Sequence, residues 1–359
     1  MPVSAASEPA AADDARESHA LVFRIASAAA MGLTLGELLG WDFPFLPAML
    51  AVQLLSGRGP LSVKQGLAFV AVIMAACVFA VLLAQIFVDR PFVLLLTVSL
   101  VTFLAFQSLA RGQAVGVAAA FLITTAVVPL LASESMSVAH GFIYSLIAGS
   151  ALAVLLAFAA HALFPSRVQA QPVSAASQQE RDPVSLALAN TAVLMSLVLY
   201  FMVTISPVSI VVVLTVISIL RQPADLGGGT AFGLILGNLV GGLAATVAYL
   251  LVTLFPSPVI LLLVVLLVGL LFGDRIARGG EFAPIYTVGL MTFLLVLGLG
   301  ISPLPEDSGS LFIARVLDVM VGAVYAIGMA SLLRSAFRTG PRRTHSGHGN
   351  GSSSPPDDR

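Results

Sequence analysis

The feature that most constrains this chain is a succession of apolar runs separated by short polar breaks. A helix needs about 20 apolar residues to cross the hydrocarbon layer of a membrane, and most of these runs have that length. Only 10% of the residues are charged and the mean hydropathy is +1.02, whereas soluble domains carry about 25% charged residues. The sequence therefore excludes a water-soluble fold and predicts an all-α, polytopic integral membrane protein.

Charge, Pro and Gly clusters divide the apolar sequence into about twelve transmembrane helices. The predicted segments are 21–39, 43–55, 63–87, 91–110, 113–132, 138–164, 184–204, 207–220, 226–255, 258–272, 282–299 and 310–333. The segments 43–55 and 207–220 are short and follow proline-containing breaks, so their full crossing of the membrane stays open.

The segments fall into two six-helix halves, residues 21–164 and 184–334, joined by a polar linker over 165–183. Residues 1–20 and 335–359 lack apolar periodicity and are predicted to be disordered tails. Arg58-Gly-Pro60 followed by Phe69 aligns with Arg221-Gln-Pro223 followed by Phe232 at one constant offset. An even number of spans in each half makes the two repeats parallel, although apolar helices also resemble one another by chance.

The distribution of charge predicts the orientation in the membrane. With both termini in the cytoplasm, nearly all basic residues lie in cytoplasmic loops, among them Arg58, Lys64, Arg111, Arg221, Arg275 and Arg278. The external loops hold Arg90 and carry the acidic residues Asp42, Asp89, Glu134, Glu306 and Asp307. Topology thus explains the basic residues and no nucleic acid partner is expected. Trp41, Phe43 and Phe45 are expected in an outer aromatic belt.

Ionisable groups inside spans are costly and are therefore candidates for function. Glu37 is predicted near the outer end of the first span, and Arg315 and Asp318 lie on one face in the outer part of the last. Together they could form a pathway for an anionic substrate and a proton. The alternative is an Arg315–Asp318 pair that only locks helix packing. Arg24, near the inner end of the first span, is expected to extend toward the surface.

Four glycines, Gly229, Gly233, Gly237 and Gly241, recur at four-residue intervals in the predicted helix 226–255. Small residues at this spacing let helix backbones approach closely, so they predict a packing interface. The alternative is an unwound stretch around Asn238 that lines a substrate path, because a polar side chain in hydrocarbon needs a partner.

The sequence contains no pattern typical of a cofactor site or a catalytic site. Cys77 is the one cysteine, and His140 and His161 are isolated, so no metal site is predicted. Lys64, the one lysine, has no phosphate-binding loop around it, and HExxH and GxSxG patterns are absent. We expect no cofactor and no enzymatic activity.

Several short segments resemble the fusaric acid resistance (FUSC-like) superfamily, namely Arg24-Ile-Ala, Leu39-Gly-Trp41, 43–47, 51–55 and Arg58-Gly-Pro60. The resemblance runs from the first span to the last and implies a bacterial inner-membrane efflux component for aromatic or other organic acids. It also implies a periplasmic membrane-fusion (HlyD-like) adaptor as a partner. Larger members carry cytoplasmic domains after each six-helix block, whereas we expect this chain, with only the linker 165–183 and a short tail, to represent an uncharacterised branch without them.

From these features we expect a multi-pass transporter of the bacterial inner membrane that exports small organic anions by secondary, proton-coupled transport. A passive anion channel and a non-transporting membrane scaffold or enzyme remain the alternatives. The sequence leaves the substrate, the coupling ion and the formation of a homo-oligomer open.

Overall fold

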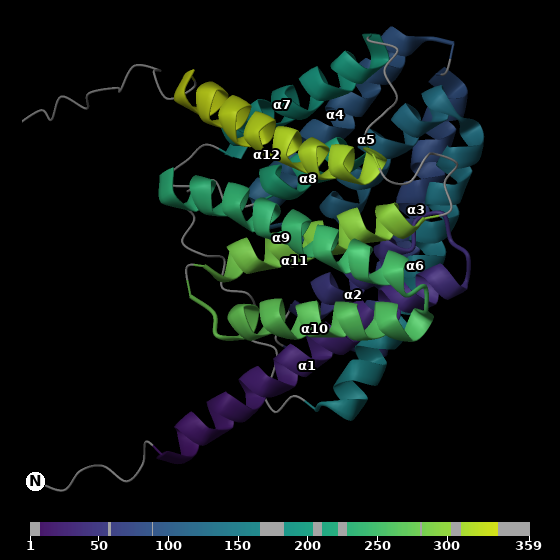
Figure 1. Cartoon of the computed structure of the whole chain (residues 1–359). Coiled ribbons are helices and arrows are strands. Elements are labelled where there is room, and N and C mark those ends of the chain that lie inside the picture. Colours follow the sequence, from purple (N-terminus) through teal and green to yellow (C-terminus); the bar gives the residue numbers. More distant parts are fainter. Residues whose placement is uncertain are drawn as a thin grey trace, which may run out of the picture.

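The computed structural model describes residues 8–56, 59–87, 89–165, 183–203, 210–221, 228–280, 282–302 and 310–336. Within these ranges every regular element is an α-helix (Figure 1). The helices are α1 (Glu8–Leu38), α2 (Phe45–Ser56), α3 (Val63–Phe87), α4 (Pro91–Ala110), α5 (Val115–Glu134), α6 (Met136–Leu163), α7 (Pro183–Val203), α8 (Ile210–Leu220), α9 (Gly228–Leu254), α10 (Pro258–Ala277), α11 (Ala283–Ile301) and α12 (Ser310–Ala336).

Ten of the twelve helices in the described ranges are long and apolar enough to cross a membrane. The other two, α2 and α8, have 12 and 11 residues. At 1.5 Å per residue these two helices are only about 16–18 Å long, whereas the hydrocarbon layer is about 30 Å thick. The expectation of twelve spans is therefore refined to ten long helices and two short ones in a multi-pass membrane protein.

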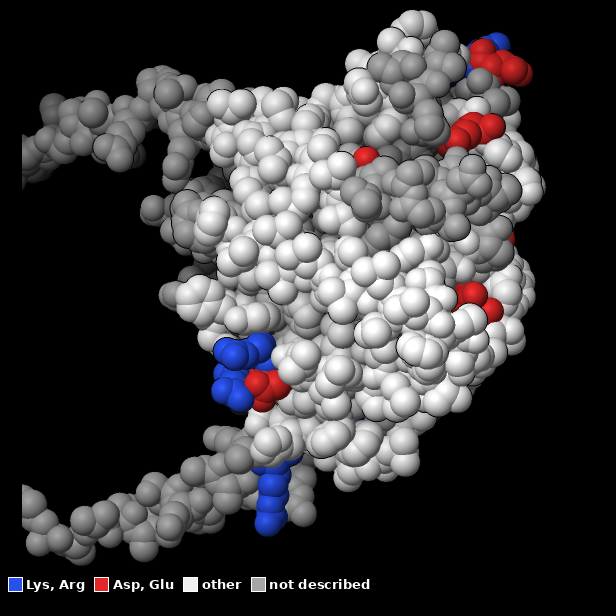
Figure 2. All heavy atoms as spheres, in the orientation of Figure 1, with Lys and Arg blue, Asp and Glu red and all other residues white. Residues whose placement is uncertain are grey.

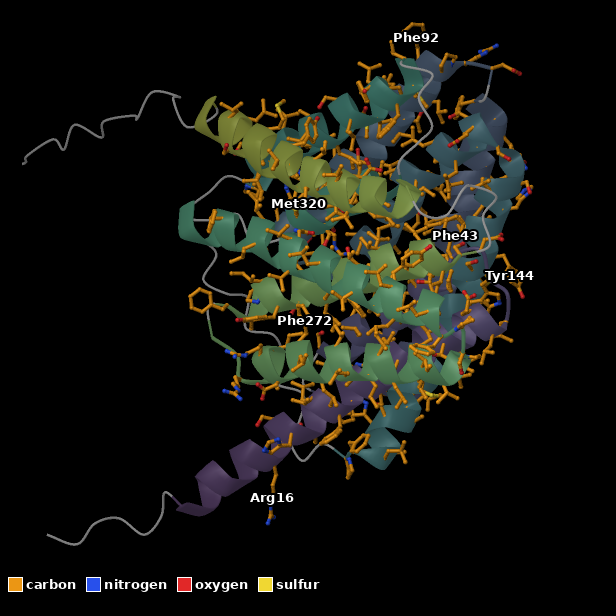
Figure 3. All side chains as sticks on the ribbon, in the orientation of Figure 1. Arg16, Phe43, Phe92, Tyr144, Phe272 and Met320 are labelled. Atoms are coloured by element: carbon orange, nitrogen blue, oxygen red, sulfur yellow. The ribbon has the colours of Figure 1, made fainter. Side chains whose placement is uncertain are left out.

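The helices form an inner and an outer set. Nearly every side chain of the short helix α8 is buried, and about two thirds of the spanning segments of α5 and α11 is buried. In α3, α9 and α10 the buried share is about one third. Their exposed side chains include large apolar residues such as Leu67, Leu236 and Leu263. Figure 3 shows another exposed apolar side chain, Phe92 of α4, projecting outward from the bundle. Such a surface suits contact with lipid chains rather than water.

Helix contacts occur in two corresponding sets. The pairs α2–α6, α3–α5 and α4–α5 have counterparts in α8–α12, α9–α11 and α10–α11. The contacts between the halves follow the same rule, because α1–α10 corresponds to α4–α7 and α2–α11 corresponds to α5–α8. Each half thus packs its fourth helix against the first helix of the other half.

The helices α4 and α10 also share their boundaries. Each has 20 residues, begins with a proline and ends with an alanine. An arginine and a glycine follow in both cases, and the glycines Gly112 and Gly279 have φ angles of 65° and 68°. A left-handed glycine after the last turn is a common way to end a helix, so both halves stop this helix by the same chemistry.

The structure differs from one sequence expectation about the first helix. The predicted disordered tail over 1–20 is helical from Glu8 onward, because α1 extends as one helix of 31 residues. Pro9 suits the first turn and the following alanines favour a helix that the apolar span has already nucleated. Residues 1–7, most of the predicted linker 165–183 and residues 337–359 lie outside the described ranges.

The three residues predicted for an outer aromatic belt, Trp41, Phe43 and Phe45, are all buried in the bundle. Phe43 and Phe45 are fully buried and form edge-to-face contacts with each other, and Phe43 makes a second such contact with Phe142 of α6. Trp41 is buried too and contacts the exposed ring of Tyr144. The break between α1 and α2 folds inward, so its aromatic rings fill the core instead of lying at a membrane surface.

The start of α1 and the end of α12 lie at the same end of the helix stack, on the left in Figure 1. On the face drawn in Figure 2, most visible Lys and Arg atoms gather at this left end, whereas most visible acidic atoms lie toward the right. On this face the two ends of the bundle therefore differ in charge, which is the pattern that the positive-inside rule predicts for a membrane protein.

Candidate functional site

One fully buried polar contact joins α9 to α11. The hydroxyl of Thr292 donates to the side-chain oxygen of Asn238 over 2.6 Å, and the Asn238 amide donates to the carbonyl oxygen of Leu234 over 2.9 Å. Asn238 and Thr292 are 1% and 5% exposed. Asn238 thus finds partners on its own helix and on α11, which satisfies a polar group that would otherwise be costly in an apolar interior.

The glycine row of α9 faces the same neighbour. Gly233 and Gly237 lie against Ile285, and Gly241 lies against Gly289, both on α11. A methyl group on Gly237 would lie 2.6 Å from the carbonyl oxygen of Ile285. The surroundings of Gly229 lie outside the described side chains. The helix α9 is continuous across this row, so the structure shows a close helix contact here and not the unwound alternative.

Glu37 lies in the last turn of α1. The N–H groups of Trp41 and Gly40 donate to the carbonyl oxygens of Gly36 and Glu37 over 3.1 and 2.9 Å, and Gly40 has a φ of 67°. This Schellman motif ends the helix directly after Glu37. One carboxylate oxygen of Glu37, Oε2, is buried and has no hydrogen-bond partner among the described residues. A buried carboxylate oxygen without a partner is costly when it is charged, which makes Glu37 a candidate proton-exchanging group.

The loop after Glu37 ties three helices together at this end of the bundle. Ser302, which follows α11, donates to the main-chain oxygen of Asp42 over 2.6 Å. The carboxylate of Asp42 lies against Gly141 of α6, leaving no room for a side chain there. The loop between α1 and α2 is thus attached to α6 and to the residue that follows α11.

The structure does not bring Glu37 together with Asp318. The helix α12 packs against α7, α8 and α9, whereas α1 packs against α2, α6 and α10. In Figure 1 these two helices lie on opposite sides of α9, α10 and α11. Asp318 is partly exposed, and the side chain of Arg315 lies outside the described part of α12. Glu37 and Asp318 thus belong to separate places in the bundle.

Arg24 differs most from its expected position. Instead of extending to the surface it is 1% exposed and turns back along α1. Its Nη2 atom forms an ion pair with Glu17 over 2.5 Å, and its Nε atom donates to the carbonyl oxygen of Ala20 over 3.3 Å. Its Nη1 atom is buried and has no partner among the described residues. A sequence signal existed, because Glu17 precedes Arg24 by two helical turns and lies on the same face.

No group of three potential metal-ligating side chains occurs among the described residues. His161 bonds through Nδ1 to the carbonyl oxygen of Ala157 over 2.9 Å, and His140 is exposed on α6.

These features define an α-helical, multi-pass membrane protein with isolated polar groups inside an apolar bundle. A family model described as "Protein of unknown function (DUF2955)" matches residues 21–160, which span α1 to most of α6. The match covers less than half of the chain. No curated protein and no solved structure gives a match.

Proposed function

We propose that this protein is a secondary transporter of the bacterial inner membrane that exports organic or aromatic acids and couples export to proton movement. A FUSC-like relationship, a periplasmic HlyD-like adaptor and cytoplasmic termini are parts of the same proposal. The observation that carries it is the duplicated set of helix contacts around two short helices.

Internal duplication with interrupted or short helices is typical of secondary transporters. In such proteins two halves move relative to each other around a site between them, and short helices place polar chain ends inside the membrane. Here the corresponding contacts α1–α10 and α4–α7, together with α2–α11 and α5–α8, join the halves. These contacts support two parallel repeats related by an axis along the membrane normal.

Glu37 is the proposed proton-exchanging group. It lies in the last turn of α1, a helix that starts at the basic end of the bundle (Figures 1 and 2), and its Oε2 atom is buried without a partner among the described residues. In the proposed orientation it faces the outer side, where protons are available to drive export of an acid. Asp318 and Arg315 on α12 then serve a different part of the pathway or helix packing.

The test is flux through the purified full chain in proteoliposomes. We expect inside-out vesicles with an acidic lumen to accumulate radiolabelled benzoate above the external concentration, whereas protein-free liposomes should not, because passive diffusion of benzoic acid favours the alkaline side. Downhill flux that never exceeds equilibrium would show the channel alternative. Absence of flux for a panel of aromatic and aliphatic acids would overturn transport and favour a scaffold or enzyme.

The role of Glu37 is tested in the same vesicles with Glu37→Gln and a matched control, Glu134→Gln. Glu134 is an exposed acidic residue at the end of α5. We expect Glu37→Gln to remove pH-driven accumulation while exchange of labelled for unlabelled benzoate persists, because the amide mimics a permanently protonated carboxyl. Equal accumulation by both variants and the unchanged protein would exclude Glu37 as the coupling group.

A further inference from the structure

The register between α1 and α2 locates the end of the short helix α2. Gly32 lies against Ala48, and Gly36 lies against Pro44 just before α2, so the two helices run antiparallel. Because the helices are antiparallel, moving four residues back along α1 corresponds to moving four residues forward along α2. This register pairs Ala28 with Val52 and then Arg24 with Ser56. Ser56 is the last residue of α2. Arg24 therefore lies at the level where α2 stops.

The last turn of α2 differs from the rest of that helix. Nearly all residues from Phe45 to Val52 are buried, but Gln53 and Ser56 are exposed and lie three residues apart on one face. Since α2 packs against α1, the register places these exposed polar side chains at the level of Arg24. Arg24 lies within the candidate membrane-spanning stretch of α1, which runs from Arg16 to Leu38.

The guanidinium group of Arg24 has one hydrogen-bond donor, Nη1, without an acceptor among the described residues. Glu17 occupies Nη2 and the carbonyl oxygen of Ala20 accepts from Nε, while Nη1 has no partner among the described residues. A guanidinium group binds a carboxylate best when both of its ends donate hydrogen bonds. Leaving a buried N–H pair without an acceptor is costly, and an anion would remove that cost.

We propose that Arg24, together with Gln53 and Ser56, forms a binding site for the carboxylate of a small organic acid at the end of α2. The site rests on the proposed transport function and names the residues that select an anionic substrate. Arg24 supplies the charge, the Gln53 amide supplies a further donor, and Glu17 competes with the substrate for the guanidinium group. The competition keeps affinity moderate, which a transported substrate needs in order to leave again.

The experiment measures benzoate binding to the purified full chain in detergent by isothermal titration calorimetry. Arg24→Gln removes the charge, whereas Arg24→Lys keeps the charge but loses the paired N–H donors of the guanidinium group. The control Arg16→Gln removes an exposed arginine two turns away on the same helix. We expect binding to weaken at least about tenfold in Arg24→Gln, and in Arg24→Lys by a smaller factor. Arg16→Gln should bind like the unchanged protein.

Glu17→Gln supplies the opposite prediction. Because it removes the competing carboxylate, we expect it to bind benzoate several times more tightly, an outcome that a purely structural ion pair would not give. If Arg24→Gln does not fold, Arg24→Lys and Glu17→Gln decide the question. Unchanged affinity in both of these would overturn the site.

A phospholipid headgroup offers the same anionic chemistry, so the titration is repeated in nanodiscs of phosphatidylcholine and of phosphatidylglycerol. We expect benzoate to bind in both. Binding that is lost in phosphatidylglycerol would assign the site to lipid and overturn the substrate proposal. Flux measurements distinguish failure of the Arg24 site from failure of the transport proposal. A normal KM with intact accumulation in Arg24→Lys would exclude this site but leave the transport proposal unaffected. Absence of flux in the unchanged protein would overturn the transport proposal itself.

Discussion

Replacing Gly237 with alanine tests the close contact between α9 and α11. The added methyl carbon would lie 2.6 Å from the carbonyl oxygen of Ile285, whereas ordinary contacts begin near 3.4 Å, so the helices must separate locally by about 0.8 Å. A gap of this size loses a quarter to a half of the dispersion energy across the contact, and such overpacking costs about 1–3 kcal/mol. The same separation strains the Thr292–Asn238 hydrogen bond of 2.6 Å, which contributes about a further 0.6–1.7 kcal/mol.

The assay uses the single cysteine of the chain. Cys77 is fully buried on α3, so a dye that fluoresces on reaction with thiols reports thermal unfolding from one site. We expect the unfolding midpoint of Gly237→Ala to fall by several degrees. The matched control is Gly328→Ala on α12, where a methyl group would meet nothing within 4 Å. That variant should be neutral or slightly stabilising because alanine favours helix. Equal midpoints for the two variants would refute the close contact.

Three further predictions concern the polar contact, the orientation and the coupling group. Asn238→Leu and Thr292→Val should show a coupling energy of about 0.6–1.7 kcal/mol in a double-mutant cycle of thermal stability, and additive effects would contradict the hydrogen bond. In a cysteine-free background, Asp89→Cys should react with an impermeant thiol reagent from the periplasm and Arg278→Cys only after the membrane is opened. Reaction of Arg278→Cys in intact cells would reverse the topology. In transport assays the rate of the unchanged protein should rise with the imposed pH gradient, whereas that of Glu37→Gln should not depend on it.

A relative movement of the two halves would affect the polar residues at the ends of the short helices α2 and α8. The contacts between halves, α1–α10 and α4–α7, connect long helices, whereas the short helices α2 and α8 are mostly buried. A change in the relative position of the halves would therefore act on the ends of the short helices. Asn190 of α7 donates to the carbonyl oxygen of Leu220, the last residue of α8, over 3.1 Å. In each half a polar residue of the first long helix thus lies at the end of the short helix.

Local sequence determined most helix boundaries. The predicted segments 63–87 and 91–110 agree with α3 and α4 residue for residue, since a membrane helix must satisfy its backbone hydrogen bonds within one apolar run. A proline at the start and an Arg-Gly pair at the end mark α4 without help from distant residues. The glycine spacing of α9 likewise indicated a packing face, but it did not say which helix packs there.

Tertiary structure decided what the isolated polar residues can do. The sequence predicts Glu37 and Asp318 at one level of the membrane, yet packing puts α1 and α12 on opposite sides of the bundle. Arg24 looked like a surface-seeking residue, and only the fold of α1 against its neighbours shows it buried with one free end. Hydropathy is a property of each segment, so the sequence alone specifies the helices. Which side chains meet depends on contacts between segments far apart in the chain, and those arise only when the helices pack.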